Sequence, residues 1–129
     1  MYKRQEIEVG FPSASDTDFN FIRELINDGH IPDDVTIQVL TQSREELIIK
    51  TIESLKGSKN AIIHLYNSTS TLQRKVVFKE DMNGVKKIAT DGAKIISDNL
   101  GVLNNTNIRL EYSPESFTGT ELPLSLIHI

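Results

Sequence analysis

Short apolar segments alternate with longer amphipathic segments along the chain. The apolar segments are rich in β-branched residues and are bounded by Gly, Pro, Asn or Asp, which is the pattern of β-strands. They cover residues 6–10, 36–41, 61–66 and 107–112. The third segment is almost continuously apolar, as expected for a parallel strand that is covered on both sides.

The segments between these predicted strands have helical periodicity. Ser15 or Asp16 can cap the first helix, and Ser43 and Glu46 form a capping-box pair before the second. A third, longer helix has an apolar stripe over residues 85–96. The positions that the first two helices are expected to bury are Phe19, Ile22 and Ile26, and then Leu47, Ile48, Ile52 and Leu55.

The order of elements is therefore β-α-β-α-β-α-β, and every crossover is long enough for a helix, so the strands are expected to be parallel. A complete (β/α)8 barrel has eight such units and typically about 250 residues, so four strands make about half of one. The predicted fold class is α/β, a partial (β/α)8 TIM barrel of about four parallel strands with intervening helices. No Gly-x-Gly-x-x-Gly follows a strand, so a dinucleotide fold has no positive support.

The composition of the chain bears on which partners the protein could bind and on where in the cell it could be found. The 129 residues are 38% hydrophobic and 25% charged, which suits one soluble globular domain. A formal net charge of -4 offers no basic surface for nucleic acid. No apolar run approaches the roughly 20 residues that cross a membrane, and no secretory signal follows the basic first residues. The absence of cysteine excludes disulfides and thiolate metal sites and is compatible with a cytoplasmic protein.

His64 stands near the end of an apolar strand and is the first candidate for chemistry. It could be a core histidine whose ring nitrogens are hydrogen-bonded, or it could contact a substrate at the mouth of a barrel. Residues 66–70 follow directly, and they are too polar for a core and too many for a tight turn.

Ser113 and Glu115 form a second candidate group at the end of the last predicted strand. A Ser-Pro-Glu turn can be no more than a strand terminator. Pro114, however, fixes its own φ and biases Ser113 toward an extended conformation, which makes the loop stiff enough to hold a ligand. Glu115 could act as an acid, a base or a hydrogen-bond acceptor.

Two carboxylates, Glu6 and Glu8, lie on the same side of the first predicted strand because strand side chains alternate. If that side faces a barrel interior, at least one of them needs a partner, and Glu6 is expected to be frayed and solvated near the chain end.

The spacing of the histidines does not indicate a metal centre, since His30, His64 and His128 are far apart in sequence. Nor is there a nucleophile motif such as Gly-x-Ser-x-Gly.

Four stretches of the sequence resemble, in the same order, the catalytic barrel of the 2-isopropylmalate synthase family. They are EIEVGFP at residues 6–12, IPDDVTIQVLTQ at 31–42, HLYNSTS at 64–70 and EYSPESFTGTEL at 111–122. The third and fourth stretches resemble this family more than its relatives, the homocitrate and citramalate synthases. The resemblance predicts that residues 1–122 are a partial catalytic barrel of the acyl-CoA Claisen, or pyruvate carboxyltransferase-like, type.

This resemblance implies a metal-dependent enzyme that joins acetyl-CoA to 3-methyl-2-oxobutanoate and releases CoA in leucine biosynthesis. A divalent metal, Mg²⁺, Mn²⁺ or Zn²⁺, would polarise the ketone of the oxo acid, and a base would remove a proton from the acetyl methyl group. By position, His64, Ser113 and Glu115 resemble substrate-binding residues, with Glu115 as a catalytic residue near the reacting centre. The resemblance further implies a cytoplasmic homodimer for the full-length enzyme.

Two motifs of the family are absent from this sequence. An Arg-Asp-Gly motif, whose Asp is a metal ligand, is expected before Met1, and a His-x-His pair of ligands is expected after Glu121. The chain alone is therefore expected to lack the family's metal ligands and to be inactive. Residues 123–129, PLSLIHI, depart from the family and are expected to be a non-native tail.

Two alternatives to a fragment of a 2-isopropylmalate synthase stay open. The chain could belong to another Claisen-type barrel, of the homocitrate or citramalate synthase kind, that acts on a different 2-oxo acid. It could also be a non-catalytic half-barrel that serves as an interaction protein, although an apolar tail beside an open barrel edge is an aggregation liability.

Overall fold

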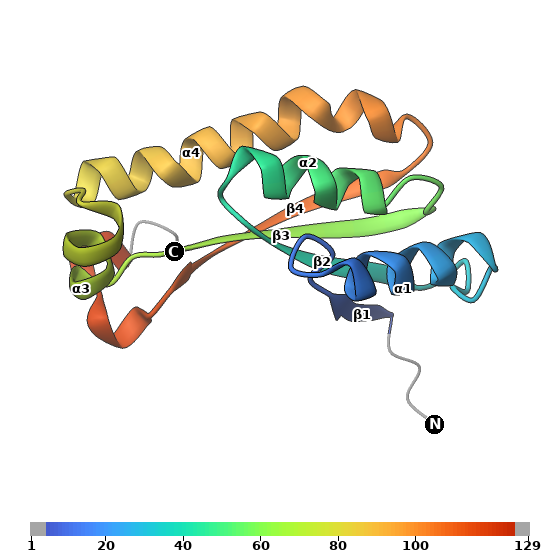
Figure 1. The fold of residues 1–129 in the computed structure, drawn as a ribbon, viewed down its shortest axis with the longest axis horizontal. Helices are drawn as coiled ribbons and strands as arrows, with labels where there is room; N and C mark the ends of the chain where they lie inside the picture. Colours follow the sequence, from blue (N-terminus) through green and yellow to red (C-terminus); the bar gives the residue numbers. More distant parts are fainter. Residues whose placement is uncertain (1–4, 126–129) are drawn as a thin grey trace.

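The computed structural model describes residues 5–125, which form one sheet and one layer of helices (Figure 1). The strands are β1 (Glu6–Gly10), β2 (Thr36–Gln42), β3 (Asn60–Ser68) and β4 (Asn107–Glu115). Their order in the sheet is β1-β2-β3-β4, and each neighbouring pair is parallel. This arrangement confirms the predicted α/β class with four parallel strands.

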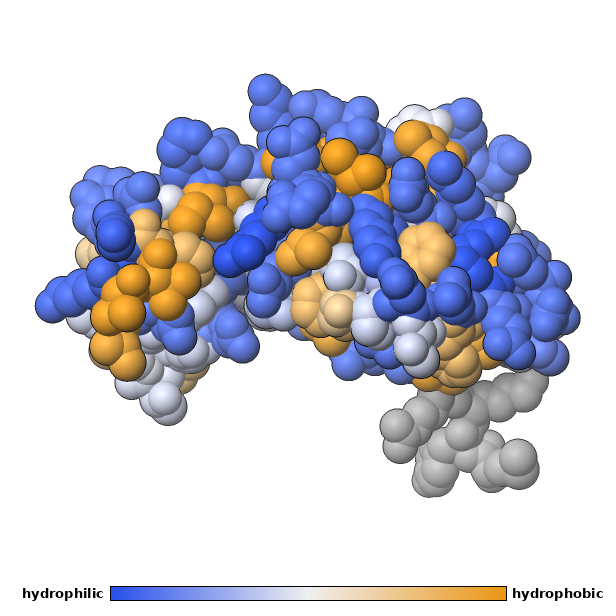
Figure 2. All heavy atoms as spheres, in the orientation of Figure 1, coloured by the Kyte–Doolittle hydropathy of each residue, from blue (hydrophilic) through white to orange (hydrophobic). Residues whose placement is uncertain are grey.

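Three long helices make the crossovers between the strands: α1 (Asp16–Asn27), α2 (Glu45–Ser54) and α4 (Met82–Asn99). Helix α2 lies between α1 and α4 and contacts both (Figure 1). The outward surfaces of α2 and α4 are mostly hydrophilic (Figure 2), as expected of amphipathic helices that bury one face. None of the helices in the described part of the chain is long and apolar enough to span a membrane.

Residues 5–125 also contain five shorter helical segments. Between β3 and α4 lie α3 (Thr71–Gln73) and the π-helix η1 (Arg74–Phe78), and the 3-10 helix η2 (Leu100–Leu103) precedes β4. After β4 come the 3-10 helix η3 (Phe117–Gly119) and α5 (Leu122–Ser125). Leu72 of α3 and Val76 of η1 have exposed apolar side chains. Orange apolar surface is visible at the left of Figure 2, the end at which Figure 1 shows α3.

The hydrophobic core lies between the sheet and the helices. Strand side chains alternate between the two faces, and the core takes only one of the two sets. Its strand members are Ile37, Val39, Ala61, Ile63 and Leu65, and its helix members include Ile22, Ile48, Ile52, Leu55 and Ile96. The opposite face has no covering layer within residues 5–125, which is the geometry of half a (β/α)8 barrel with its interior open.

The uncovered face is concave. Glu6 on β1 forms an ion pair with Arg109 on β4, although these strands lie at opposite edges of the sheet. Strand side chains stand roughly perpendicular to a sheet, and neighbouring strands are about 4.8 Å apart, so the contact requires the sheet to curve toward this face. The expectation that Glu6 would be frayed is therefore wrong, because it is a strand residue reached by an Arg side chain from the far edge, whereas its side chain is 52% exposed and solvated as expected.

One of the two predicted helix caps is confirmed and the other is wrong. The Ser15 hydroxyl accepts a hydrogen bond from the Asp18 N–H at 3.1 Å and caps α1. In α2 the N-cap is Arg44, whose side chain makes no capping bond. The Ser43 hydroxyl instead donates to the carbonyl of Ile88 in α4 at 2.6 Å, because α4 packs close enough to compete for it.

The predicted non-native tail, residues 123–129, lies in part outside the described residues. Residues 126–129 are outside the described residues. Pro123 and Leu124 lie in α5, and the Leu124 side chain is buried. The assignment of the tail stays a prediction.

Gly92 tests the packing of α4 against the β2–α2 loop. A Cβ atom at Gly92 would lie 2.1 Å from the Ser43 Oγ and 3.2 Å from Leu65 Cδ2. We expect Gly92→Ala to lower the free energy of unfolding by about 1–3 kcal/mol, since Ser43 would have to give up its bond to Ile88. Urea unfolding followed by circular dichroism measures this.

Gly101→Ala is the matched control, because a Cβ atom there would meet open space. An equal loss in the two variants would show that Gly92 is not a packing constraint.

Candidate active site

The carboxyl ends of β3 and β4 bring the predicted site residues onto the concave face. The register pairs His64 with Glu111, Tyr66 with Ser113, and Ser68 with Glu115. Alternation places all six of these side chains on the face opposite the hydrophobic core.

Both strands run further than predicted, to Ser68 and Glu115, so Ser113 and Pro114 are strand residues rather than a terminating turn. Proline is tolerated because β4 is the edge strand of the described sheet.

His64 and Ser113 are in direct contact. The His64 Nε2 lies 2.7 Å from the Ser113 Oγ, and the Glu111 carboxylate is 3.9 Å from the same nitrogen. The other ring nitrogen, Nδ1, lies 3.2 Å from the Gln38 Nε2 of β2. The His64 side chain is 16% exposed, so it is mostly buried, but among polar partners and outside the hydrophobic core. A histidine in this setting has the chemistry to hold a polar ligand on the concave face.

Glu115 lies on the same face but does not join the His64–Ser113 pair. In the described structure, no hydrogen bond links its carboxylate to either residue. Its side chain lines a cavity of about 230 Å³ at the carboxyl ends of the strands, together with Gln42, Tyr66 and Gln73. Ligands of open α/β sheets and of barrels bind at this end of the strands. Glu115 is thus placed to face a ligand in the cavity, two residues beyond Ser113 along β4.

The hydroxyl-rich segment after His64 is a buried polar cluster. The side chains of Asn67, Ser68, Thr69 and Ser70 are buried, so the expectation that this segment is too polar for a core is wrong. Hydrogen bonds reduce the penalty for burying them: the Ser68 and Thr69 hydroxyls bond to Ser116 and Thr120 after β4, and the Ser70 hydroxyl accepts from the Gln73 N–H. The Thr69 N–H donates to the Glu115 carbonyl at 3.1 Å, and the Thr69 hydroxyl is 2.9 Å from the Thr120 hydroxyl.

Tyr112 extends this cluster to the helix-covered face. Its hydroxyl donates to the Asn67 Oδ1 at 2.9 Å. Burial raises the pKa of Tyr112 to about 12, so the hydroxyl keeps its proton and remains a donor at neutral pH.

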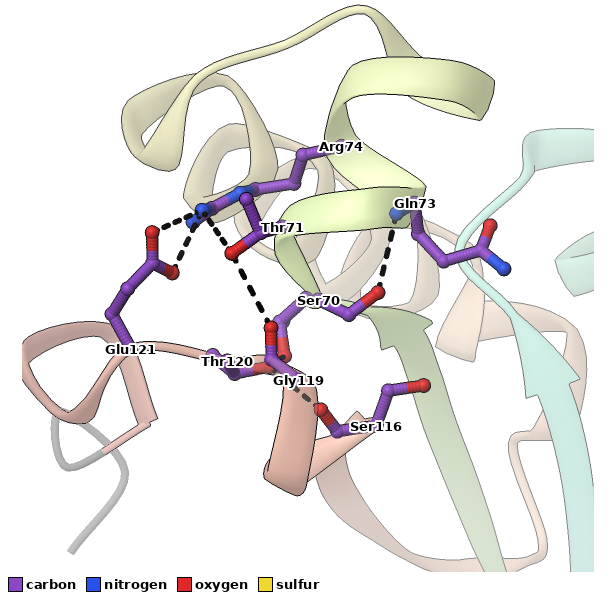
Figure 3. Close-up of polar contacts among 9 residues, drawn as sticks. Ser70, Thr71, Gln73, Arg74, Ser116, Gly119, Thr120 and Glu121 are labelled. Carbon is purple, nitrogen blue, oxygen red and sulfur yellow. Dashed lines mark hydrogen bonds and ion pairs between the residues drawn. The ribbon is translucent and has the colours of Figure 1, made fainter.

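Arg74, in the segment after β3, binds Glu121, in the segment after β4 (Figure 3). Its Nη2 donates to both Glu121 carboxylate oxygens, at 2.6 and 2.7 Å, and to the Thr71 hydroxyl at 3.3 Å. Ser116, with a φ of 67°, turns the chain back, and Gly119 passes so close to Ser70 that a Cβ atom would lie 3.0 Å from the Ser70 Cβ. These contacts close the polar cluster beside the cavity.

The Arg74–Glu121 pair was not identified from the sequence. The partners are 47 positions apart and lie in segments whose spacing carries no periodic signal. Only the opposite charges within hydroxyl-rich stretches could have suggested it.

A divalent metal does not fit the residues that the structure describes. Within residues 5–125, no three His, Asp or Glu side chains gather closely enough to hold a metal ion. The His64 neighbourhood supplies one imidazole, one nearby carboxylate and an amide, which fall short of such a site.

The protein family and the known proteins that this chain resembles agree with the α/β fold described above. The HMGL-like family matches residues 2–126. The 2-isopropylmalate synthase of Renibacterium salmoninarum is 65% identical over 118 residues, which cover 92% of this chain. Those of Parafrankia sp. and Mesorhizobium japonicum are 63% identical over 123 residues and 58% identical over 122 residues, each covering 95% of this chain. The resemblance predicted from the sequence is thereby confirmed.

The chain spans about one fifth of the length of these curated relatives. It covers 20% of the first and 22% of the other two.

The Arg74–Glu121 pair makes the stability of this region depend on pH. The hydrogen bond from Arg74 lowers the pKa of Glu121 below its ordinary value of 4.5. A carboxyl whose pKa is lower in the folded state stabilises the fold above its unfolded pKa, and that contribution is lost as pH falls through the folded pKa. We expect Glu121→Gln to lower the thermal unfolding midpoint at neutral pH, and the difference from the parent to shrink below pH 4.5.

Glu24→Gln, which removes the same charge from an exposed position on α1, should show no such trend with pH. If the Glu121→Gln difference stayed constant across the acid range, the ion pair would not be its source.

Proposed function

The chain belongs to the HMGL-like family, and on that basis we propose that it forms part of the catalytic barrel of a 2-isopropylmalate synthase. The proposed reaction joins the acetyl methyl carbon of acetyl-CoA to the ketone carbon of 3-methyl-2-oxobutanoate. Water then cleaves the thioester, so that CoA and 2-isopropylmalate leave. The product would enter leucine biosynthesis.

The observation that carries this proposal is the His64–Ser113 contact on the concave face, at 2.7 Å. His64 and Ser113 form a hydrogen-bonded pair whose hydroxyl is a neutral donor that can bind a carboxylate or ketone oxygen of a 2-oxo acid. They come from adjacent parallel strands whose side chains are held by the sheet, so their relative position is set before a ligand binds. The names of the relatives, 58–65% identical, support the same substrate class.

Glu115 is proposed to act nearest the reacting centre. Its carboxylate lines the cavity at the strand ends, two residues beyond Ser113 on the same face. From there it can accept a proton or a hydrogen bond from a substrate group in the cavity. In this proposal His64 and Ser113 orient the 2-oxo acid, and Glu115 serves as the catalytic residue.

The remaining elements of the proposal concern the whole enzyme. In this family a divalent metal would supply Lewis-acid polarisation of the ketone. The described residues do not form a site for such an ion, and its ligands are proposed to lie outside this chain. The whole enzyme is proposed to be a cytoplasmic homodimer.

Substitution in a full-length protein that carries this chain tests the roles of the site residues. We expect His64→Ala and Glu115→Ala each to lower turnover by about 10²-fold or more, the usual scale for acid–base and charge-stabilising groups. The measurement is CoA release from acetyl-CoA and 3-methyl-2-oxobutanoate in the presence of Mg²⁺.

Two matched controls accompany these variants. His30→Ala and Glu53→Ala alter exposed side chains away from the concave face and should leave turnover close to that of the parent. Near-normal rates for the site variants would remove His64 or Glu115 from the site. A preference for a 2-oxo acid with another side chain would favour a different Claisen-type barrel, and no release with any oxo acid would favour a non-catalytic protein.

A further inference from the structure

A row of polar side chains crosses the concave face and draws one residue from each strand. Glu8 comes from β1, Gln38 from β2, His64 from β3 and Ser113 from β4. We propose that Gln38 is a positioning residue that holds His64 as the neutral tautomer with its proton on Nε2. The Ser113 hydroxyl is thereby left to donate to a substrate oxygen. This inference rests on the proposed function for the identity of that substrate.

The orientation of the Gln38 amide follows from its neighbour Glu8. The Gln38 Nε2 lies 3.5 Å from the Glu8 Oε2 and 3.2 Å from the His64 Nδ1. A carboxylate only accepts hydrogen bonds, so it favours the NH₂ side of the amide. Turning the amide around would place its oxygen against a carboxylate oxygen. Glu8 thus selects the orientation in which Gln38 presents an N–H to the imidazole.

The tautomer of His64 follows from the amide. Because Gln38 donates to Nδ1, that nitrogen must carry a lone pair, and the ring proton of the neutral imidazole is on Nε2. The Nε2–H then donates to the Ser113 Oγ at 2.7 Å. With its oxygen accepting this bond, the Ser113 hydroxyl has its own proton available for an acceptor on the concave face.

The opposite polarity would give the site the opposite character. An acceptor in place of the Gln38 N–H would draw the ring proton to Nδ1. His64 Nε2 would then accept a hydrogen bond from the Ser113 hydroxyl, and a substrate carboxylate or ketone would meet lone pairs instead of a donor. The order of donors across the four strands therefore decides whether this site binds an acceptor such as a 2-oxo acid.

Exchanging the first two members of the row tests this directly. The double variant Glu8→Gln/Gln38→Glu keeps the composition and net charge of the pair but reverses its donor polarity. In ¹⁵N magic-angle-spinning NMR of the histidine-labelled full-length protein, with His64 assigned by its loss in His64→Gln, we expect Nδ1 to be unprotonated in the parent and protonated in the double variant. This readout does not depend on turnover.

Kinetics supply the second measurement. We expect the double variant to lower kcat/KM for the 2-oxo acid by about tenfold or more, the scale on which outer hydrogen-bond partners act, with KM for acetyl-CoA unchanged. Gln38→Met, which keeps the length of the side chain but has no donor and only a weak thioether acceptor, should cost less, because it leaves the tautomer unset rather than reversed.

A purely structural role for Gln38 predicts the reverse order, with methionine at least as harmful as the polar exchange and the ring proton unmoved. Either result would overturn the inference. If the ring proton moves as expected but no variant and no parent protein releases CoA, the role of Gln38 stands and the proposed function fails.

Discussion

The alternation of side chains along four parallel strands is the constraint on which the rest of this structure depends. Because successive residues point to opposite faces, a single sequence supplies both an apolar surface and a polar one. The apolar set packs under α1, α2 and α4, and the polar set occupies the concave face. A shift of one residue in β3 or β4 would move His64 or Ser113 to the helix-covered face, so the core and the candidate site are specified together.

The region beyond the strand ends follows a different rule. There the chain buries hydroxyl and amide groups instead of apolar ones, and hydrogen bonds between the two segments after β3 and β4 compensate for their lost hydration. Arg74 and Glu121 complete this cluster with an ion pair in which the arginine side chain is 6% exposed. A buried polar cluster of this kind fixes geometry more strictly than an apolar one, because each donor must meet its own acceptor.

Much of the fold could be predicted from the sequence, because strands and long helices have local periodic signals. The parallel direction of the strands followed from crossover length. His64 and Ser113 each stand near the end of a predicted strand, and the carboxyl ends of parallel strands meet at one edge of a sheet. The bond from Ser43 to Ile88 in place of a helix cap, the burial of residues 67–70 and the Arg74–Glu121 pair were not predictable. Each of these depends on a partner from a distant segment, such as Ile88 for Ser43, and no local pattern records that choice.

The ion pair between Glu6 and Arg109 joins residues 103 positions apart. A ribosome adds about 5–20 residues per second, so β1 exists for several seconds before the residues of β4 are made. During that time each new strand can add to the sheet behind its helix, and the apolar face can grow with the nascent chain. The concave face cannot form in this stepwise way, because its row of polar side chains and the Glu6–Arg109 ion pair need β4. Assembly of the candidate site is therefore the non-local, late event in the folding of this segment, as expected where contact order is high.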